Sequence, residues 1–394
     1  MTMVVNCKER IIEIGHELGF HQISIGSLAP MNEALVTYQG WLDKGYAASM
    51  DYLKRDPARR TDPALTYPAA RSVIIVAVSY FSEPPPMPAD GSWGKVARYA
   101  VGLDYHNVIR AKLRELTARL EIELGLSRPI QRRPVTDDAA LYEQALAARH
   151  GLGFIGKNSL LIGPKLNGSF NLIGELFVDL ELEPDFPYQG SCGQCVRCQT
   201  ACPTDAIKSG AEVGLVDANA CISFLTIENK FGIDISLRAG LGDWVFGCDI
   251  CQEVCPYNKK ALPAPWPEFR PAAGVGHYLN LPELLQIADQ ESFFKRFETS
   301  PVRRPKRRGL LRNALVVMGN QLRRGHHAEA EIIAAIADFT ARESDPMLLE
   351  HAVWALHQAR LGSGQGAGRA AAVIDGVLAG ALHEKTRLEI AAYV

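Results

Sequence analysis

Cysteine is unevenly distributed along this chain. Eight of the nine cysteines lie between Cys192 and Cys255, seven of them in the runs SCGQCVRCQTACP and CDICQEVCP. Two, two and three residues separate the cysteines of the first run, and a proline follows the last of them. The N-terminal sequence has neither an apolar signal segment nor a paired-arginine export motif, so we expect a cytoplasmic protein. Thiols stay reduced in that compartment, and the runs therefore predict bound metal rather than disulfides.

The spacing is the one with which bacterial two-cluster ferredoxins bind 4Fe-4S clusters: three thiolates of a run hold one cluster, and the fourth crosses to the other. In the second run Cys248, Cys251 and Cys255 have matching intervals, but Val245 occupies the place of a first cysteine. Cys221, between the runs, is the candidate for the missing ligand. Crossing of the fourth ligands predicts one set formed by Cys192, Cys195, Cys198 and Cys255, and a second set formed by Cys202, Cys221, Cys248 and Cys251.

Structural zinc is the alternative for these cysteines, because thiolates and C-x2-C pairs also suit zinc. A triple C-x2-C-x2-C followed by x3-C-P is the iron-sulfur pattern, which favours clusters. Two clusters with interleaved ligands lie close together and can relay single electrons from an external donor. Cys7 is far from both runs and has no predicted role.

Three regions follow one another along the chain. Residues 1–183 alternate helical and strand-like segments, which predicts an α/β domain. Its expected elements are strands within residues 71–80 and 171–183 and a helix with the apolar stripe Ile109, Leu113, Leu116 and Leu120. Residues 184–265 carry the cysteine runs with little periodicity, so we expect a domain organised around its metal. Residues 275–394 are rich in alanine and leucine and predict an all-helical domain.

The helical region contains a weak internal repeat. Segments beginning at Leu310, Leu348 and Arg387 align at offsets of 38 and 39 residues. This period is typical of HEAT-like helix pairs. A plain helical bundle with chance similarity is the alternative.

A basic segment opens the same region. The formal net charge of the whole chain is only −2, so a polyanion would have to be held by a local patch. The segment SPVRRPKRRGLLRN contains no acid, and Arg323 and Arg324 follow one helix later. We expect phosphate contacts with a nucleic acid, the alternative being a solvated loop. The basic residues of the segment are Arg303, Arg304, Lys306, Arg307, Arg308 and Arg312.

Three shorter motifs have less specific interpretations. The sequence GLGFIG at residues 151–156 matches a dinucleotide-binding fingerprint, but a helical pattern precedes it where a strand is required, so we expect a turn that ends a helix at Gly151. Asp137 and Asp138 are expected at the start of that helix, either complementing its dipole or supplying a general acid. Asp104-x-His106 begins like a cobalamin-binding motif, but Ile109 stands where that motif has glycine, so no axial histidine is predicted.

Taken together, these motifs resemble the epoxyqueuosine reductase family along nearly the whole chain. The resemblance is carried by RYAVGLDYH (residues 98–106), VTDDAALYEQALAARHGLGFIGKNSLLI (residues 135–162), both cysteine runs with Cys221, and SPVRRPKRRGLLRNALVVMGN (residues 300–320). It implies an α+β multidomain protein: an N-terminal α/β cobalamin-binding domain like that of reductive dehalogenases, a two-cluster ferredoxin-like domain and a C-terminal HEAT-like domain.

The resemblance also implies a reaction. The family removes the epoxide oxygen of epoxyqueuosine at the wobble position of tRNA, giving queuosine and water with two electrons and two protons. Electrons would pass from an external low-potential donor through both clusters to cobalamin, producing a nucleophilic reduced corrin. Asp137 resembles the family's proton donor, with a pKa raised by an apolar site. By the same resemblance Arg60, Ala100, Asn158 and Leu161 would face the corrin.

The implied partner is the anticodon stem-loop of tRNAs with GUN anticodons, and we expect a monomer that does not associate with membranes. The RNA backbone would be held by Arg303, Arg304, Lys306, Arg307 and Arg308, with the wobble base turned out into the pocket. Two alternatives are a cobalamin-dependent reductive dehalogenase acting on small organohalides and a non-catalytic ferredoxin-type electron carrier. The missing export motif and the basic helical region argue against the first, and bound corrinoid would exclude the second.

Overall fold

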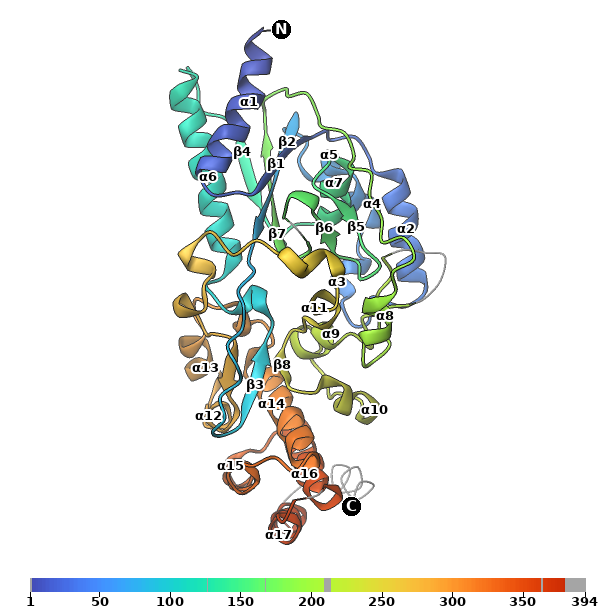
Figure 1. Cartoon of the computed structure of the whole chain (residues 1–394), viewed down its shortest axis with the longest axis vertical. Coiled ribbons are helices and arrows are strands. Elements are labelled where there is room, and N and C mark those ends of the chain that lie inside the picture. The colour runs from blue at the N-terminus through green and yellow to red at the C-terminus, as the bar shows by residue number, and fades with distance from the viewer. Residues whose placement is uncertain (1, 126, 167, 209–213, 363, 380–394) are drawn as a thin grey trace. The chain divides into compact units, whose positions relative to one another are not determined.

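A computed structural model describes residues 2–125, 127–166, 168–208, 214–362 and 364–379 (Figure 1). Packing groups the chain into two compact units. Unit 1 consists of Met1–Glu83, Gly102–Asn219 and Asp249–Gly274, and unit 2 consists of Pro84–Val101, Ala220–Cys248 and Val275–Val394. Each unit therefore combines segments that are far apart in the sequence. The division into three consecutive domains stays a prediction.

The centre of unit 1 is a four-stranded antiparallel sheet with the order β1-β2-β7-β4. Its strands are β1 (Gln22–Gly26), β2 (Ser72–Ser79), β7 (Asn171–Val178) and β4 (Arg132–Val135). The strand predicted within residues 71–80 is confirmed as β2, and every residue of it is buried. The strand predicted within residues 171–183 is confirmed as β7, although it ends at Val178.

Helices cover both faces of this sheet. On one face α1 (Thr2–Glu17) and α6 (Tyr105–Glu123) pack together, and the predicted stripe of α6 is confirmed because all four residues are fully buried. Gly174 of β7 lets α6 pack closely on the sheet, since a Cβ at this position would lie only 2.6 Å from Cγ2 of Ile109. On the other face α7 (Glu143–Arg149) packs through Leu146 against a core that includes Ile75 and Phe177.

The remaining elements of unit 1 are short. They are α2 (Asn32–Asp43), α3 (Asp51–Lys54), α4 (Pro57–Thr61), α5 (Pro63–Thr66), α8 (Arg197–Ala201), α11 (Ile250–Glu253), the two-stranded hairpin of β5 (Phe154–Ile155) and β6 (Leu161–Ile162), and the 3-10 helices η2 (Pro164–Leu166), η4 (Pro256–Lys260), η5 (Pro267–Phe269) and η6 (Pro271–Ala273).

Unit 2 is mainly helical and is built around α14 (Lys306–Arg323), of which residues 309–322 are all buried. Its other helices are α9 (Ile222–Ile227), α10 (Ile235–Arg238), α12 (Leu281–Leu285), α13 (Gln290–Arg296), α15 (Glu329–Arg342), α16 (Pro346–Leu361), α17 (Ala367–Ala379), η1 (Arg98–Ala100), η3 (Ala239–Leu241) and η7 (Pro301–Arg303). A small sheet has the order β8-β3-β9, formed by Trp244–Phe246, Trp93–Val96 and Tyr278–Asn280. Val245, where the second cysteine run lacks its first cysteine, is fully buried in β8.

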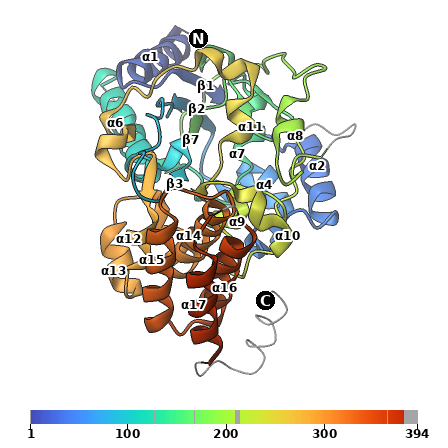
Figure 2. The ribbon, with the colours of Figure 1, turned by 60° about the horizontal axis from the view of Figure 1, so that its bottom comes forward.

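The internal repeat corresponds to two consecutive helix pairs. Leu310 begins the first copy in α14 and Leu348 begins the second in α16, and both side chains are fully buried. Helices α14, α15, α16 and α17 pack against one another (Figure 2). The third copy, from Arg387, lies outside the described residues, and a HEAT-like arrangement stays a prediction. None of the described helices combines the length and apolarity needed to cross a membrane.

Candidate functional site

Asp137 and Asp138 lie in the loop that connects β4 to α7. The expectation that they begin a helix is wrong, because α7 starts only at Glu143. Asp137 has a φ of 53°, in the left-handed region that a helix start cannot use. The alternative in which both aspartates complement the dipole of α7 is therefore not supported.

Tyr105 contacts Asp137 directly. The Tyr105 hydroxyl donates a hydrogen bond of 2.6 Å to Oδ2 of Asp137. Tyr105 is the first residue of α6, and its side chain is buried. The sequence alone indicates no role for Tyr105, although this residue belongs to the RYAVGLDYH motif that carries the family resemblance.

The neighbours of Tyr105 have a structural role. Asp104 is the N-cap of α6, and its Oδ1 accepts the backbone N–H of His106 at 3.1 Å. The same oxygen lies 2.6 Å from Nδ1 of His106. These contacts account for Asp104-x-His106 as a helix cap.

Asp138 has a different environment from Asp137. An ion pair of 2.5 Å joins its Oδ2 to Arg110 on α6, and its Oδ1 accepts the backbone N–H of Thr136 at 3.2 Å. This ion pair and the backbone contact engage both carboxyl oxygens of Asp138. Of the two aspartates, Asp137 is therefore better placed to act as an acid. Asp137 is exposed, however, so the protein alone does not provide the apolar site expected from the sequence.

Two further carboxyl groups lie near Asp137. Oε1 of Glu143 accepts the backbone N–H of Asp137 at 2.6 Å. Burial, and then the charge of Asp137, raise the pKa of Glu143 well above its usual range. Glu175 is fully buried in β7, opposite Ile75 and Val135, and its pKa is also raised by burial and then by Glu143. The sequence signal that we missed is a single acid inside the otherwise uncharged strand NLIGELFV.

The four residues expected to face a corrin are divided between the units. Arg60, Asn158 and Leu161 belong to unit 1, whereas Ala100 belongs to η1 of unit 2 and is fully buried there. Arg60 donates to the carbonyl of Tyr52 at 2.8 Å. Its Nε is buried, and no described residue hydrogen-bonds it. Asn158 and Leu161 are both buried, in the turn and second strand of the β5–β6 hairpin.

The glycine-rich segment before this hairpin is a turn, as predicted. Helix α7 ends at Arg149, and Gly151 follows with a φ of 90°, a conformation that favours glycine. The segment then enters β5 rather than a helix, which excludes a dinucleotide-binding turn.

The first predicted cluster set gathers in unit 1. Cys192, Cys195, Cys198 and Cys255 line one small cavity, together with Asn158, Ile162, Arg197, Pro256 and Tyr257. The backbone N–H of Lys157 points to Sγ of Cys192 at 3.4 Å. Burial, and then neighbouring thiols of the set, raise the pKa values of Cys198 and Cys255. Four converging thiols with a peptide N–H directed at sulfur fit a 4Fe-4S cluster, which deprotonates its ligands and is tuned by such hydrogen bonds.

The residues of the second predicted set do not all belong to one unit. Cys202 and Cys251 belong to unit 1, and Cys221 and Cys248 belong to unit 2. The Sγ of Cys202 accepts the backbone N–H of Ala206 at 3.3 Å. All nine cysteines lie in the described part of the chain, and none of them forms a disulfide. Among the described residues, no group of three His, Cys, Asp or Glu side chains is arranged to hold a single metal ion.

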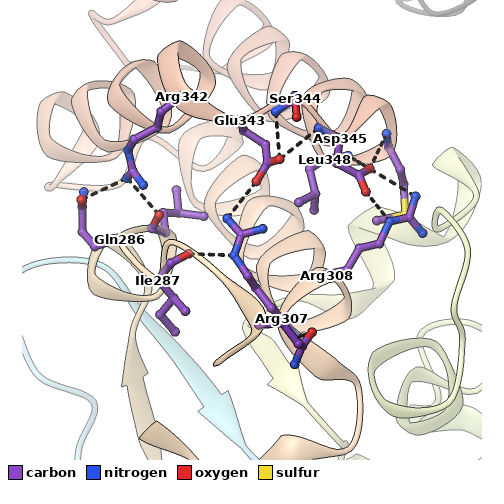
Figure 3. Close-up of polar contacts among 12 residues, drawn as sticks. Gln286, Ile287, Arg307, Arg308, Arg342, Glu343, Ser344, Asp345 and Leu348 are labelled. Carbon is purple, nitrogen blue, oxygen red and sulfur yellow. Dashed lines mark hydrogen bonds and ion pairs between the residues drawn. The ribbon is translucent and has the colours of Figure 1, made fainter. Parts of the chain in front are cut away.

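Tertiary contacts neutralise much of the basic segment, for which the sequence predicts phosphate contacts. Figure 3 shows Arg307 and Arg308 of α14 directed at acids that precede α16. Arg307 pairs with Glu343 at 2.8 Å, and Arg308 pairs with Asp345 at 2.5 Å. Arg304 pairs with Glu228 at 2.8 Å. The sequence run contains no acid, but the fold supplies three.

Arg312 is fully buried and cannot reach a nucleic acid. Its guanidinium donates to the carbonyls of Leu225, Asn229 and Phe231, and burial lowers its pKa to about 9. The adjacent Asn313 donates to the carbonyls of Thr226 and Val245. The end of the RRGLLRN motif, Arg312 and Asn313, therefore stabilises the packing of α14 inside unit 2.

Arg303 and Lys306 are the members of the segment best placed for phosphate. Both are exposed. Arg303 lies over the ring of Phe294, 5.7 Å from its centroid, and donates to the carbonyl of Glu298 at 3.1 Å. Neither contact neutralises its charge. Arg323 and Arg324, one helix later, are less available for phosphate, because Arg324 pairs with Asp243 and Arg323 donates to the carbonyl of Leu361.

Two family descriptions match separate parts of the chain. Residues 60–137 match "Epoxyqueuosine reductase QueG, DUF1730", and residues 191–258 match "4Fe-4S double cluster binding domain". The second match covers both cysteine runs and favours iron-sulfur clusters over structural zinc.

Curated relatives and solved structures agree with these matches. The epoxyqueuosine reductase of Pseudomonas aeruginosa is 37% identical over 359 residues, covering 89% of this chain and 94% of the relative. That of Escherichia coli is 35% identical over 364 residues, covering 89% of each. A crystal structure of epoxyqueuosine reductase with an epoxyqueuosine-modified tRNA-Tyr stem loop is 27% identical and covers 99% of this chain and 98% of that chain, with a TM-score of 0.85. The Bacillus subtilis enzyme, solved with its catalytic aspartate loop swung out of the active site, is 26% identical over 99% of this chain and 98% of that chain, with a TM-score of 0.84.

Proposed function

This chain belongs to the epoxyqueuosine reductase family, and we propose that it reduces epoxyqueuosine to queuosine at the wobble position of tRNA. The reaction opens the epoxide, forms a carbon–carbon double bond and releases the oxygen as water, with two electrons and two protons. The full-length similarity to named epoxyqueuosine reductases supports this function. The observation that carries it in the structure is the pairing of Asp137 with Tyr105, which a bare electron carrier would not need.

The cysteine sets hold two 4Fe-4S clusters, which carry single electrons from an external low-potential donor. The first set is Cys192, Cys195, Cys198 and Cys255, which line one cavity. Cys202, Cys221, Cys248 and Cys251 are the proposed ligands of the second cluster. The peptide N–H groups of Lys157 and Ala206, directed at cysteine sulfur, stabilise the negative charge of the thiolates.

Cobalamin is the proposed second cofactor, and bound cobalamin supplies a strongly reducing cobalt centre. The chain offers a polar group that fits such a ligand. In the described part of the chain, Nε of Arg60 has no hydrogen-bond partner. An amide oxygen of the cofactor can accept a hydrogen bond from it. Arg60, Asn158 and Leu161 are the proposed contacts in unit 1, and Ala100 is the proposed contact in unit 2.

Asp137 is the proposed general acid for the departing oxygen. Tyr105 holds Oδ2, so the proton is delivered from Oδ1, the other oxygen of the same carboxyl group. The left-handed backbone of Asp137 places the carboxyl group on an exposed loop, where bound cofactor and substrate would exclude water from it. The Bacillus subtilis relative, whose catalytic aspartate loop is swung out of the active site, supports a loop that moves during turnover.

The RNA partner is the anticodon stem-loop of GUN-anticodon tRNAs, in line with the solved relative that contains an epoxyqueuosine-modified stem loop. Arg303 and Lys306 contact backbone phosphates, whereas Arg304, Arg307 and Arg308 contribute less because acids neutralise them. We infer a monomeric enzyme.

One reconstitution experiment tests this function. The chain is loaded anaerobically with iron, sulfide and cobalamin, mixed with a reductant and an epoxyqueuosine stem-loop, and the digested nucleosides are analysed by mass. Queuosine should form. Asp137→Asn should abolish turnover with cofactor content unchanged, whereas Asp138→Asn should retain most of it. Fully loaded protein that forms no queuosine would overturn the proposal.

A further inference from the structure

The backbone of Asp137 needs support from its surroundings. Its φ of 53° is uncommon for a residue with a side chain. Such conformations persist only where neighbouring contacts hold them, and they occur often at functional sites. The loop is exposed at both Asp137 and Asp138, so packing alone does not fix it.

Glu143 supplies a contact of the required kind. Its Oε1 accepts the backbone N–H of Asp137 at 2.6 Å, across six residues of sequence. Glu143 is the first residue of α7, whose residues Ala145, Leu146 and Ala147 are buried in the core of unit 1. The hydrogen bond therefore ties an exposed loop to a rigid helix.

The acidic surroundings of Glu143 determine how it interacts with the Asp137 backbone N–H. The ionisable groups that influence Glu143 are Asp137 and Asp138 of its loop and Glu175 of β7, all of them acidic. Burial and these neighbours raise the pKa of Glu143 well above its usual range, so the neutral form is favoured. A neutral carboxyl group acts here through the position of its acceptor oxygen and not through charge.

We propose that Glu143 is a positioning residue, which holds Asp137 in its proton-donating conformation by accepting the Asp137 backbone N–H. Glu143 does not touch the substrate; it acts through Asp137. When the hydrogen bond is made, Asp137 keeps its left-handed backbone and its carboxyl group stays against the Tyr105 hydroxyl. When it breaks, the loop can leave the site. This inference rests on the proposed role of Asp137 as the acid.

Two matched variants distinguish the position of the acceptor oxygen of Glu143 from the charge of its carboxyl group. Glu143→Gln keeps an acceptor oxygen at the same distance but removes the ionisable group. Glu143→Asp keeps the ionisable group and the acidic start of α7 but withdraws the oxygen by one methylene. Both substitutions are conservative, and Glu143 is the first residue of α7 and not one of its buried core residues, so the fold should survive. The full-length protein loaded with clusters and cobalamin is used throughout.

The first readout is hydrogen–deuterium exchange at the single amide of Asp137, which does not depend on activity. In the unaltered protein and in Glu143→Gln this amide should be protected, and in Glu143→Asp it should exchange about tenfold faster. The second readout is turnover. Glu143→Asp should lower kcat by roughly tenfold or more, with KM for the stem-loop unchanged, because a displaced acid slows chemistry without weakening RNA binding.

Each other outcome identifies what has failed. An Asp137 amide that exchanges freely in the unaltered protein would overturn the proposal, and so would equal exchange in both variants. If Glu143→Gln lost turnover while Glu143→Asp kept it, the charge of Glu143 would matter more than the position of its oxygen. That result would also overturn the proposal. Full activity of Asp137→Asn would instead remove Asp137 as the acid, while leaving the exchange results as an independent record of the hydrogen bond.

Discussion

The hydroxyl of Tyr105 and the carboxyl group of Asp137 form a 2.6 Å hydrogen bond between residues 32 positions apart in the sequence. Tyr105 is anchored as the first residue of α6, whereas Asp137 belongs to an exposed loop. The residue on the helix therefore orients the residue on the loop, whereas Asp138 pairs with Arg110 instead.

Removal of the Tyr105 hydroxyl should slow the chemical step. We expect Tyr105→Phe to lower kcat by roughly 10- to 100-fold, because an acid that is no longer oriented spends less time in a productive geometry. The KM for the stem-loop and the cobalamin content should not change. Tyr278→Phe is a matched control, since the hydroxyl of Tyr278 makes an equally short bond of 2.6 Å, to the carbonyl of Pro85. Equal kinetics of the two variants would contradict the role of Tyr105.

Iron content should report the two cysteine sets separately. Cys255→Ser removes a ligand of the first set and Cys221→Ser removes one of the second, so each should reduce iron from about eight to about four per chain. Cys7→Ser is the control and should keep all the iron. Undiminished iron in Cys221→Ser would show that another group completes the second cluster.

The exposed cations of the basic segment should determine the salt dependence of RNA binding. Arg303→Gln combined with Lys306→Gln removes two proposed phosphate contacts, so the slope of log affinity against log salt should decrease by about 1.5. Binding is measured by fluorescence anisotropy of a labelled stem-loop between low and moderate salt. A slope equal to that of the unaltered protein would mean that these side chains are ordinary solvated surface.

The ion pair between Arg307 and Glu343 should make the stability of unit 2 depend on pH. Burial raises the pKa of Glu343, but backbone N–H groups and Arg307 outweigh it, so the pKa is lowered below the usual value. A lowered carboxyl pKa stabilises the fold above the unfolded pKa of about 4.3, and this stability is lost as pH falls through the lower folded value.

We therefore expect the thermal unfolding midpoint to fall between pH 7 and pH 3.5, and Arg307→Met to reduce that difference. At pH 7 the same substitution should cost about 1–3 kcal/mol, because it leaves Glu343 without its charged partner. Arg296→Met is the control, since its pair with Glu283 is more exposed and should matter little. An Arg307→Met protein with the stability of the control would contradict this account.

Local spacing was enough to group the cysteines of the first set and to predict several elements of the fold. Intervals of two and three residues place thiolates on one side of a short turn, so the set of Cys192, Cys195 and Cys198 is visible in the sequence itself. The stripe of α6 and the apolar run of β2 were equally readable, because each depends on neighbours within a few residues.

Contacts between distant residues could not be read in this way. The sequence pointed to Asp137, but only the tertiary structure brought Tyr105, Glu143 and Glu175 to it from separate elements. The basic segment likewise contains no acid, yet Glu343 and Asp345, 36 and 37 residues away, neutralise Arg307 and Arg308. The charge and protonation of a side chain depend on what surrounds it in space, and that is decided by packing rather than by neighbours along the chain.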